Sequence, residues 1–156
     1  MKRLCLLTVV LLISLTTVSA QQQGEKSIGI NAGYGSEIES YKLGVNFKYN
    51  FSDQFRVAPS FEYYLERRGL SFWDANADAN YLVYVGDGIN AYPLAGLTLM
   101  RGSSKSFSNT EFGVNLGGGI DFRLVDALDF NIEAKYQILD NWSQFALCLG
   151  ISYRIW

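Results

Sequence analysis

A strict alternation of apolar and polar residues runs through most of this chain. It is clearest at 41–51, where six apolar or aromatic residues at odd positions alternate with polar residues and Gly44 at even positions. A period of two sends successive side chains to opposite faces of a β-strand, whereas an amphipathic helix needs a period near 3.6. The sequence therefore predicts an all-β fold of eight strands, at 27–34, 41–51, 55–65, 73–85, 89–101, 112–124, 128–138 and 145–155.

The segments between the predicted strands differ in length in a regular way. The segments 52–54, 86–88 and 125–127 have three residues each, whereas 35–40, 67–72, 102–110 and 139–144 are longer. Short turns at one rim and longer loops at the other are typical of bacterial outer-membrane barrels, and an even strand number puts both termini on one side. We therefore predict an eight-stranded antiparallel up-and-down transmembrane β-barrel with both termini periplasmic.

Outside the less regular strand at 89–101, the charged residues of the predicted strands fall on the polar parity, which also carries most of the strand glycines. Small residues are needed on the crowded inner side of a narrow barrel, so the polar parity is predicted to face inward. The apolar parity of these strands carries no charge, as a lipid-facing surface requires, because Arg or Lys at the bilayer midplane costs about 2–4 kcal/mol. Opposite charges can then pair in a lumen charge network formed by Lys42, Lys48, Arg56, Glu62, Asp74, Asp78, Asp121, Arg123, Glu133 and Lys135.

Two other functions are compatible with the same alternation. A soluble lipocalin-like barrel turns its apolar face inward and binds a ligand there. A membrane barrel with a less crowded lumen is a narrow pore for small solutes. Aromatic residues near the predicted strand ends, such as Tyr41 and Trp73, favour a membrane barrel with interfacial girdles. A filled lumen is favoured because eight strands enclose only enough space for side chains, and the bulky ones on the polar parity are Lys48, Arg56, Tyr64, Tyr84, Arg123 and Lys135.

The first twenty residues have the composition of a secretory signal. Two basic residues precede an apolar stretch at 4–13, and small residues end at Ala20. The apolar stretch is shorter than the roughly 20 residues that span a bilayer as a helix. Cleavage after Ala20 leaves Cys148 as the single cysteine, so no intramolecular disulfide is expected. We predict a signal peptide at 1–20, a short N-terminal tail at 21–26 and an outer-membrane β-barrel domain at 27–156.

The composition excludes several kinds of chemistry. The 156 residues include no His, which removes Ser-His-Asp triads and imidazole metal sites. Without the two basic residues of the predicted signal, 11 basic residues stand against 15 acidic ones, so a nucleic-acid-binding surface is not expected. Asp74-x-Asn76-x-Asp78 matches the first ligands of a calcium loop, but Ala79 and Val85 stand where Gly and Glu are required. We expect no catalytic residues, no metal, no cofactor and no enzymatic activity, including activity on lipid.

The last predicted strand ends in a pattern that resembles the C-terminal assembly signal of outer-membrane barrels. Gly150, Tyr153 and Ile155 have the spacing of this signal, whereas the terminal aromatic residue, Trp156, lies one residue beyond it. Further stretches that carry a resemblance are 92–98 (YPLAGLT), 115–120 (NLGGGI) and 133–137 (EAKYQ). On these residues, the whole mature chain resembles the small outer-membrane β-barrel (porin-like) families that are common in Bacteroidota.

That resemblance implies a place in the outer membrane of a Gram-negative cell. It implies contact with outer-membrane lipid and delivery by periplasmic chaperones and the barrel assembly machinery. It supplies no agreed activity. Together with the filled polar lumen it favours a structural or surface-interaction role, and we expect the barrel to be monomeric.

Overall fold

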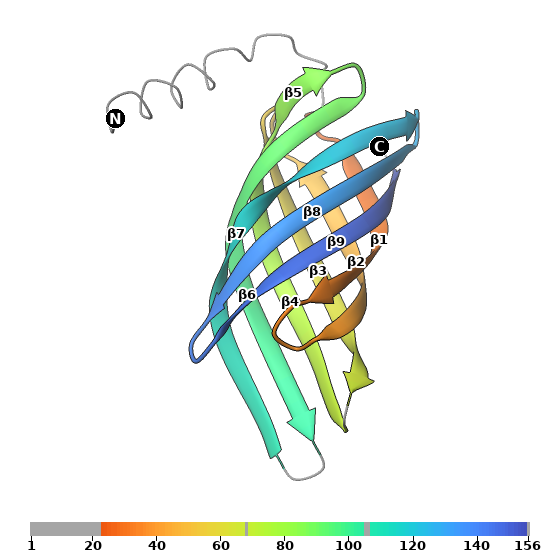
Figure 1. Ribbon diagram of the computed structural model, residues 1–156. Coiled ribbons are helices and arrows are strands. Elements are labelled where there is room, and N and C mark those ends of the chain that lie inside the picture. Colours follow the sequence, from red (N-terminus) through yellow and green to blue (C-terminus); the bar gives the residue numbers. More distant parts are fainter. Residues whose placement is uncertain (1–22, 68, 105–106, 156) are drawn as a thin grey trace, which may run out of the picture.

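The described part of the chain is a single antiparallel sheet of nine strands (Figure 1). The computed structural model describes residues 23–67, 69–104 and 107–155, so the predicted signal peptide and Trp156 lie outside the described residues. No helix within these ranges is long and apolar enough to cross a bilayer. The strands are β1 (Lys26–Gly35), β2 (Ser40–Asn50), β3 (Phe55–Arg67), β4 (Leu70–Tyr81), β5 (Val83–Gly86), β6 (Ile89–Ser104), β7 (Phe107–Val125), β8 (Leu128–Leu139) and β9 (Ser143–Arg154).

The sheet closes on itself into a barrel. Chain neighbours pair with one another, except β4 and β5, and β1 also pairs with β9. β4 pairs with β6 from Ser71 to Asn80, and β5 pairs with β6 beyond that point, so β4 and β5 share one position in the wall on either side of Leu82. The predicted eight-stranded antiparallel closed barrel is therefore confirmed. Closure gives every strand except the short β5 a partner on both edges, which a membrane span requires because lipid offers no hydrogen bonds to a free edge.

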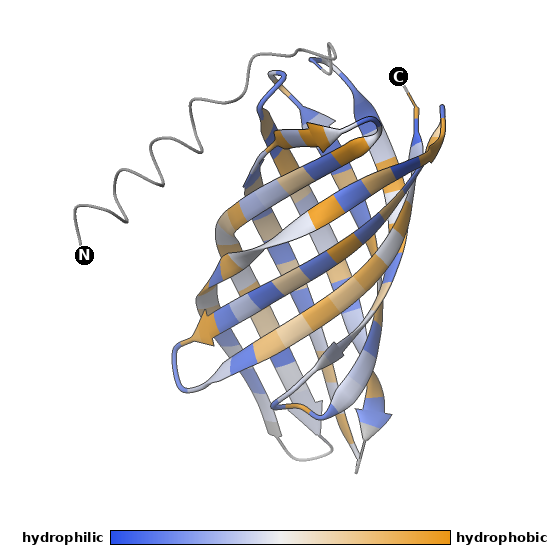
Figure 2. Cartoon of the chain, turned by 45° about the horizontal axis from the view of Figure 1, so that its top comes forward, coloured by the Kyte–Doolittle hydropathy of each residue, from blue (hydrophilic) through white to orange (hydrophobic). Residues whose placement is uncertain are grey.

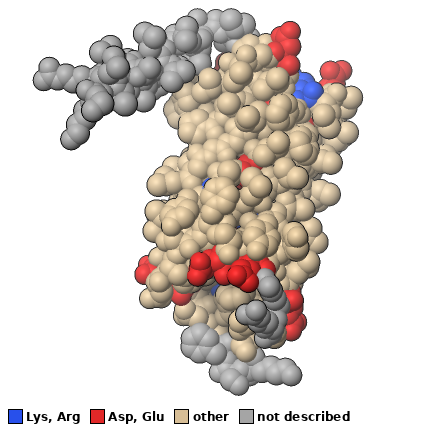
Figure 3. Space-filling view, viewed as in Figure 1, with Lys and Arg blue, Asp and Glu red and all other residues tan. Residues whose placement is uncertain are grey.

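The outer wall of the barrel is apolar and the inner wall is polar. Outward Leu116 is 52% exposed, whereas the next residue inward, Asn115, is fully buried. Figure 2 shows hydrophobic and hydrophilic residues alternating along the strands. In the space-filling view of Figure 3, most charged atoms of the visible face gather toward the two ends. The apolar parity thus faces outward, as the sequence predicts for a membrane barrel.

Outward aromatic residues form a belt near each rim. Phe61 packs against Trp73 near one rim, and Phe55 packs against Tyr81 near the other, with ring centroids 5.5 and 5.1 Å apart. On β9 the two belts are represented by Phe145 and Tyr153. Their separation is about 27 Å along the strand and about 21 Å across a bilayer at a tilt of about 40°, near the roughly 25 Å apolar band of such barrels. Between the belts, no outward position of the described strands carries a charged side chain.

Both ends of the described chain lie at the same rim, which we call the terminal rim. Ser27 in β1 lies opposite Arg154 in β9, and the β2–β3, β5–β6 and β7–β8 turns are at this rim as well (Figure 1). The opposite rim, which we call the hairpin rim, carries the β3–β4 and β6–β7 hairpins together with the β1–β2 and β8–β9 connections.

The connections at the hairpin rim are shorter than predicted. β3 continues to Arg67 and β4 begins at Leu70, while β6 and β7 pair out to Ser104 and Phe107. The long loops predicted at 67–72 and 102–110 are therefore wrong, and the strict alternation of short turns with longer loops does not hold. Backbone hydrogen bonds continue these strands into segments whose outward side chains are polar. Strand ends predicted from apolar alternation therefore come too early. The two hairpins project beyond the rest of the rim (Figure 1).

Candidate functional site in the barrel lumen and its mouth

The lumen is lined by charged side chains that are almost completely buried. Two glycines on the inner wall provide space for them: a Cβ at Gly96 would collide with Asp78, and one at Gly119 would lie 2.5 Å from the Tyr92 hydroxyl oxygen. Eight residues of the predicted charge network are at most 6% exposed: Lys42, Lys48, Arg56, Glu62, Asp74, Asp78, Asp121 and Lys135. They group into ion clusters that connect strands on different sides of the barrel.

The cluster nearest the hairpin rim joins β2, β3 and β4. Lys42 Nζ contacts Glu62 Oε2 and lies 3.9 Å from Asp74 Oδ2. Neutral donors serve the same carboxylates: Asn31 Nδ2 donates to Glu62 Oε1 at 2.7 Å, and the Tyr64 hydroxyl donates to Asp74 Oδ2 at 3.0 Å. Because one buried cation serves two carboxylates, these extra hydrogen bonds are needed to satisfy the remaining oxygens.

A second cluster crosses the middle of the lumen from β8 to β4. Lys135 Nζ lies 3.3 Å from Asp78 Oδ2 and 3.5 Å from Glu133 Oε1. Asn115 on β7 donates to Asp78 Oδ1 at 2.7 Å, and Gln137 on β8 donates to the Thr98 hydroxyl of β6 at 3.3 Å. Apart from the Lys135–Glu133 contact within β8, these contacts join strands that do not pair with each other, so they fill the cross-section instead of following the wall.

The third cluster lies toward the terminal rim and centres on Asp121. Its two oxygens contact Lys48 Nζ at 3.0 Å and Arg56 Nη1 at 2.5 Å. The Arg56 guanidinium lies 4.6 Å from the Tyr92 ring centroid, a cation–π contact. The Tyr92 hydroxyl donates to Glu133 Oε2 at 3.0 Å. Since Glu133 also contacts Lys135, the polar network continues from the terminal side of the lumen to its middle.

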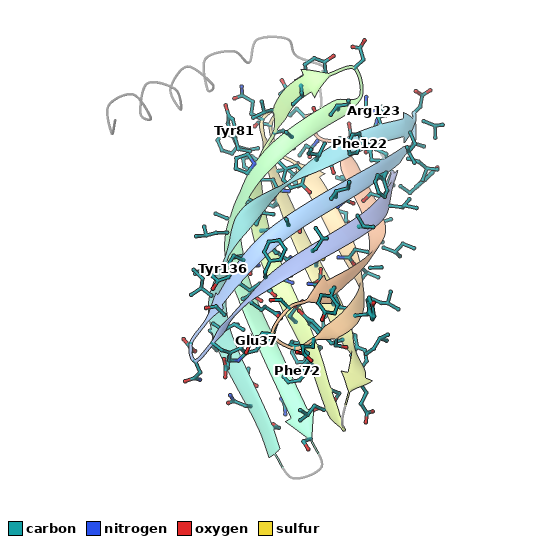
Figure 4. All side chains as sticks on the ribbon, in the orientation of Figure 1. Glu37, Phe72, Tyr81, Phe122, Arg123 and Tyr136 are labelled. Carbon is teal, nitrogen blue, oxygen red and sulfur yellow. The ribbon has the colours of Figure 1, made fainter. Side chains whose placement is uncertain are left out.

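Arg123 departs from its predicted place in the lumen. Its side chain is 33% exposed at the terminal rim, with Nε 3.8 Å from Asp129 Oδ1 (Figure 4). Arg154 is the more buried of the two arginines, donating to both oxygens of Asp129 at 2.7 and 2.9 Å and lying 2.5 Å from Glu25. Partial burial raises the pKa of the Glu25 carboxyl, which Arg154 opposes. Arg123 lies near the end of β7, beside the β7–β8 turn. A side chain on the inward parity at this height therefore lies at the rim and not deep in the lumen.

Tyr84 was also predicted to fill the lumen, and that prediction is wrong. The side chain is 39% exposed and donates to Asp87 Oδ1 at 2.7 Å. The regular wall breaks at Leu82, which points inward and is buried, and the register shifts again between Tyr84 and Gly86. A register irregularity turns the following side chains away from their expected face. Odd–even counting along the sequence therefore predicts the wrong face for residues beyond it.

Side chains close the lumen toward both rims. The recess at the terminal rim, bordered by Arg56 and Asp121, has a volume of about 20 Å³, which is room for about one water molecule. Toward the hairpin rim, buried Tyr64, Met100 and Leu139 form an apolar layer across the barrel, with Ile38, Phe72 and Trp142 packed on it. The charged clusters therefore lie between a narrow polar recess and an apolar layer.

Two adjoining hollows open above this apolar layer, and we call them together the mouth hollow. The smaller has a volume of about 200 Å³ and the larger about 490 Å³. Both are bordered by Leu70, Phe72 and Trp142, the smaller also by Glu111 and the larger by Glu37. Glu37 and Phe72 lie close together at this end in Figure 4. Sequence reasoning missed this site. The sequence feature that could have predicted it is the presence of two large apolar residues, Phe72 and Met100, on the polar parity near predicted strand ends.

The described residues provide no arrangement for metal binding. Within them, no group of three or more Asp, Glu or Cys could hold a metal ion. Asp74, Asn76 and Asp78, which resemble the start of a calcium loop, lie along the lumen face of β4, where Asn76 Nδ2 donates to Asp74 Oδ1 at 2.8 Å. Cys148 is 2% exposed and lies against Gly33 on the inner wall.

Comparison with known families identifies the barrel. A family model described as an outer membrane protein beta-barrel domain matches residues 7–154. The chain belongs to this family. Members of this family are β-barrels of the outer membrane, so the predicted outer-membrane location is confirmed and the soluble lipocalin-like alternative is set aside. Among curated proteins, none matches the sequence.

Several solved outer-membrane barrels are similar in fold to this family member. The N-terminal barrel domain of Pseudomonas aeruginosa OprF is 18% identical with a TM-score of 0.75, covering 85% of this chain and 98% of that chain. Neisserial surface protein A is 14% identical with a TM-score of 0.66, covering 83% and 95%. Ail, the attachment invasion locus protein of Yersinia pestis, is 20% identical with a TM-score of 0.61, covering 85% and 99%. At these identities the likeness concerns the fold alone, and a Bacteroidota origin stays a prediction.

Proposed function

We propose that this protein is a structural and surface-interaction barrel whose lumen is sealed. The observation that supports this most strongly is the set of buried lumen cations, Lys42, Lys48, Arg56 and Lys135, each of which contacts a carboxylate. A solute could pass only if these pairs separated, and breaking a buried ion pair costs about 3–5 kcal/mol. Several such pairs in series make solute conduction through the barrel a rare event.

The proposed orientation places the terminal rim in the periplasm and the hairpin rim outside the cell. Short periplasmic turns opposite projecting surface elements are the usual arrangement of outer-membrane barrels. Gly150, Tyr153, Ile155 and Trp156 then form the signal by which the barrel assembly machinery receives the chain from periplasmic chaperones. In this proposal the mature barrel is a monomer surrounded by outer-membrane lipid, with no nucleic-acid partner and no enzymatic activity.

In this proposal the hairpin rim carries the surface-interaction role, because it is the rim that faces the outside of the cell. The β3–β4 and β6–β7 hairpins project there, and the mouth hollow lies between them and the β1–β2 and β8–β9 connections. The structurally similar Ail is an attachment invasion locus protein, which supports a surface-interaction role at this rim.

Conductance in planar lipid bilayers tests the sealed lumen. Purified protein is reconstituted, and its insertion is checked by flotation of the vesicles used for delivery. We expect no stable unitary current from the wild-type barrel. Arg56→Ala removes a side chain that crosses the lumen and serves as the matched variant that should conduct more. A stable wild-type current that Arg56→Ala changes in size would instead support the narrow-pore function.

A further inference from the structure

One buried carboxylate in the mouth hollow lacks part of its hydrogen bonding. Glu111 on β7 is 8% exposed and borders the smaller hollow. Its Oε1 accepts from Asn109 Nδ2 at 2.8 Å and from Asn141 Nδ2 at 3.2 Å. Its Oε2 is buried and has no hydrogen-bond partner among the described residues. An ionised oxygen in this situation loses its solvation without a replacement, which is costly unless a donor arrives.

Most of the remaining lining of the smaller hollow is apolar and partly aromatic, although Ser103, Ser104 and Asn109 also border it. Leu70, Phe72, Met100 and Trp142 border it. A Cβ at Gly102 would lie 2.5 Å from the Phe72 ring, so the absence of a side chain at this position lets the ring lie directly against β6. The hollow therefore combines a mostly apolar lining with one carboxylate, that of Glu111, which lacks part of its hydrogen bonding. This combination is typical of sites for small amphipathic ligands.

We infer that the mouth hollow binds a small organic ammonium ion, a protonated amine carried on an apolar or aromatic body. The ammonium supplies the donor that Glu111 Oε2 lacks and also neutralises its charge. A guanidinium is less suitable, because bidentate pairing needs both carboxylate oxygens and Oε1 already accepts from two amides. The rings of Phe72 and Trp142 pack against the body of the ligand or place their faces against the cation.

The position of the hollow suits a ligand that arrives from water. Next to it, the outward residues of β4 and β6 are Ser71 and Ser103, which are paired across the two strands and lie past the outer aromatic belt at Trp73. Glu37 borders the larger hollow and adds negative potential at the entrance. This inference goes beyond the sealed lumen, and it depends on the proposed orientation only for which side of the membrane supplies the amine.

Nuclear magnetic resonance of the full barrel in lipid nanodiscs tests the inference. The probe is 2-phenylethylammonium, and 2-phenylethanol is its neutral counterpart of nearly equal size. The indole N–H signal of Trp142 is assigned with Trp142→Phe. We expect this signal to shift saturably with the ammonium and to respond much less to the alcohol at the same concentration. Glu111→Gln keeps the side-chain shape but removes the charge, and it should weaken ammonium binding by about tenfold or more.

Glu66→Gln is the matched control. Glu66 is exposed on β3 and borders neither hollow, so the same change of charge there should leave the affinity unchanged. Equal binding of the alcohol, an unchanged affinity in Glu111→Gln, or a response at the lipid-facing Trp73 instead of Trp142 would each overturn the inference. So would the absence of any saturable shift at about 10 mM ammonium. If Glu111→Gln does not fold, the ammonium and alcohol comparison on the wild type decides alone. Conductance plays no part in this test, so its outcome is separate from that of the sealed lumen.

Discussion

Replacing Asp121 by Asn should destabilise the barrel far more than the loss of a single surface charge. Asn keeps the size of the side chain but removes the counter-ion of two buried cations. Lys48 and Arg56 lie 3.0 and 2.5 Å from the two carboxylate oxygens, and all three side chains are 7% exposed. We expect Asp121→Asn to lower the free energy of unfolding by about 3–5 kcal/mol, the usual cost of breaking a buried ion pair.

Part of that loss is repulsion between the two cations left behind. Because both touch one carboxylate, their charges are at most about 8 Å apart, which at an effective dielectric constant near 20 corresponds to about 2 kcal/mol of repulsion. A second substitution, Lys48→Met, removes this repulsion. The double variant Lys48→Met/Asp121→Asn should therefore be more stable than Asp121→Asn alone, by about 1–2 kcal/mol, which is a coupling of ordinary size for contacting residues.

Equilibrium urea unfolding from lipid vesicles, followed by tryptophan fluorescence, measures these differences. Asp126→Asn, in the exposed β7–β8 turn, is the matched control and should change stability by no more than about 0.5 kcal/mol. A double variant that is less stable than Asp121→Asn, as independent contributions would give, would refute the assignment of Asp121 as a shared counter-ion. An Asp121→Asn variant no less stable than the control would refute the whole account of the lumen cluster.

Two further predictions concern the wall and its packing. In a cysteine-free background, a spin label at Leu116 should collide readily with membrane-dissolved oxygen, whereas one at Asn115 should be shielded inside the barrel; equal collision rates would contradict the assigned faces. Gly119→Val should lower the free energy of unfolding by about 2 kcal/mol, since its Cβ would meet the tyrosine ring that covers Gly119. Gly86→Ala, where a Cβ has no atom within 4 Å, is the control in the same urea unfolding measurement, and equal losses in both variants would contradict this packing.

The period-two alternation was enough to predict which side of the wall most residues face. Leu116 and Asn115 follow the predicted parity because consecutive strand residues point to opposite faces whatever the strand pairs with. The same local rule failed at Tyr84 and in the projecting hairpins. Strand breaks and strand ends depend on which backbone partner is available, and an apolar pattern does not record this partner.

The partners across the lumen were decided by the tertiary structure alone. Lys48 and Asp121 are 73 residues apart, and Lys135 and Asp78 are 57 apart. Parity predicts that these side chains enter the lumen. The stagger of the strands around the closed barrel sets the position of each side chain along the barrel axis, and therefore which side chains contact one another. The mouth hollow has the same origin. Glu111 on β7, Phe72 on β4 and Trp142 between β8 and β9 come together only when the barrel closes, because closure brings strands from distant parts of the chain to one rim.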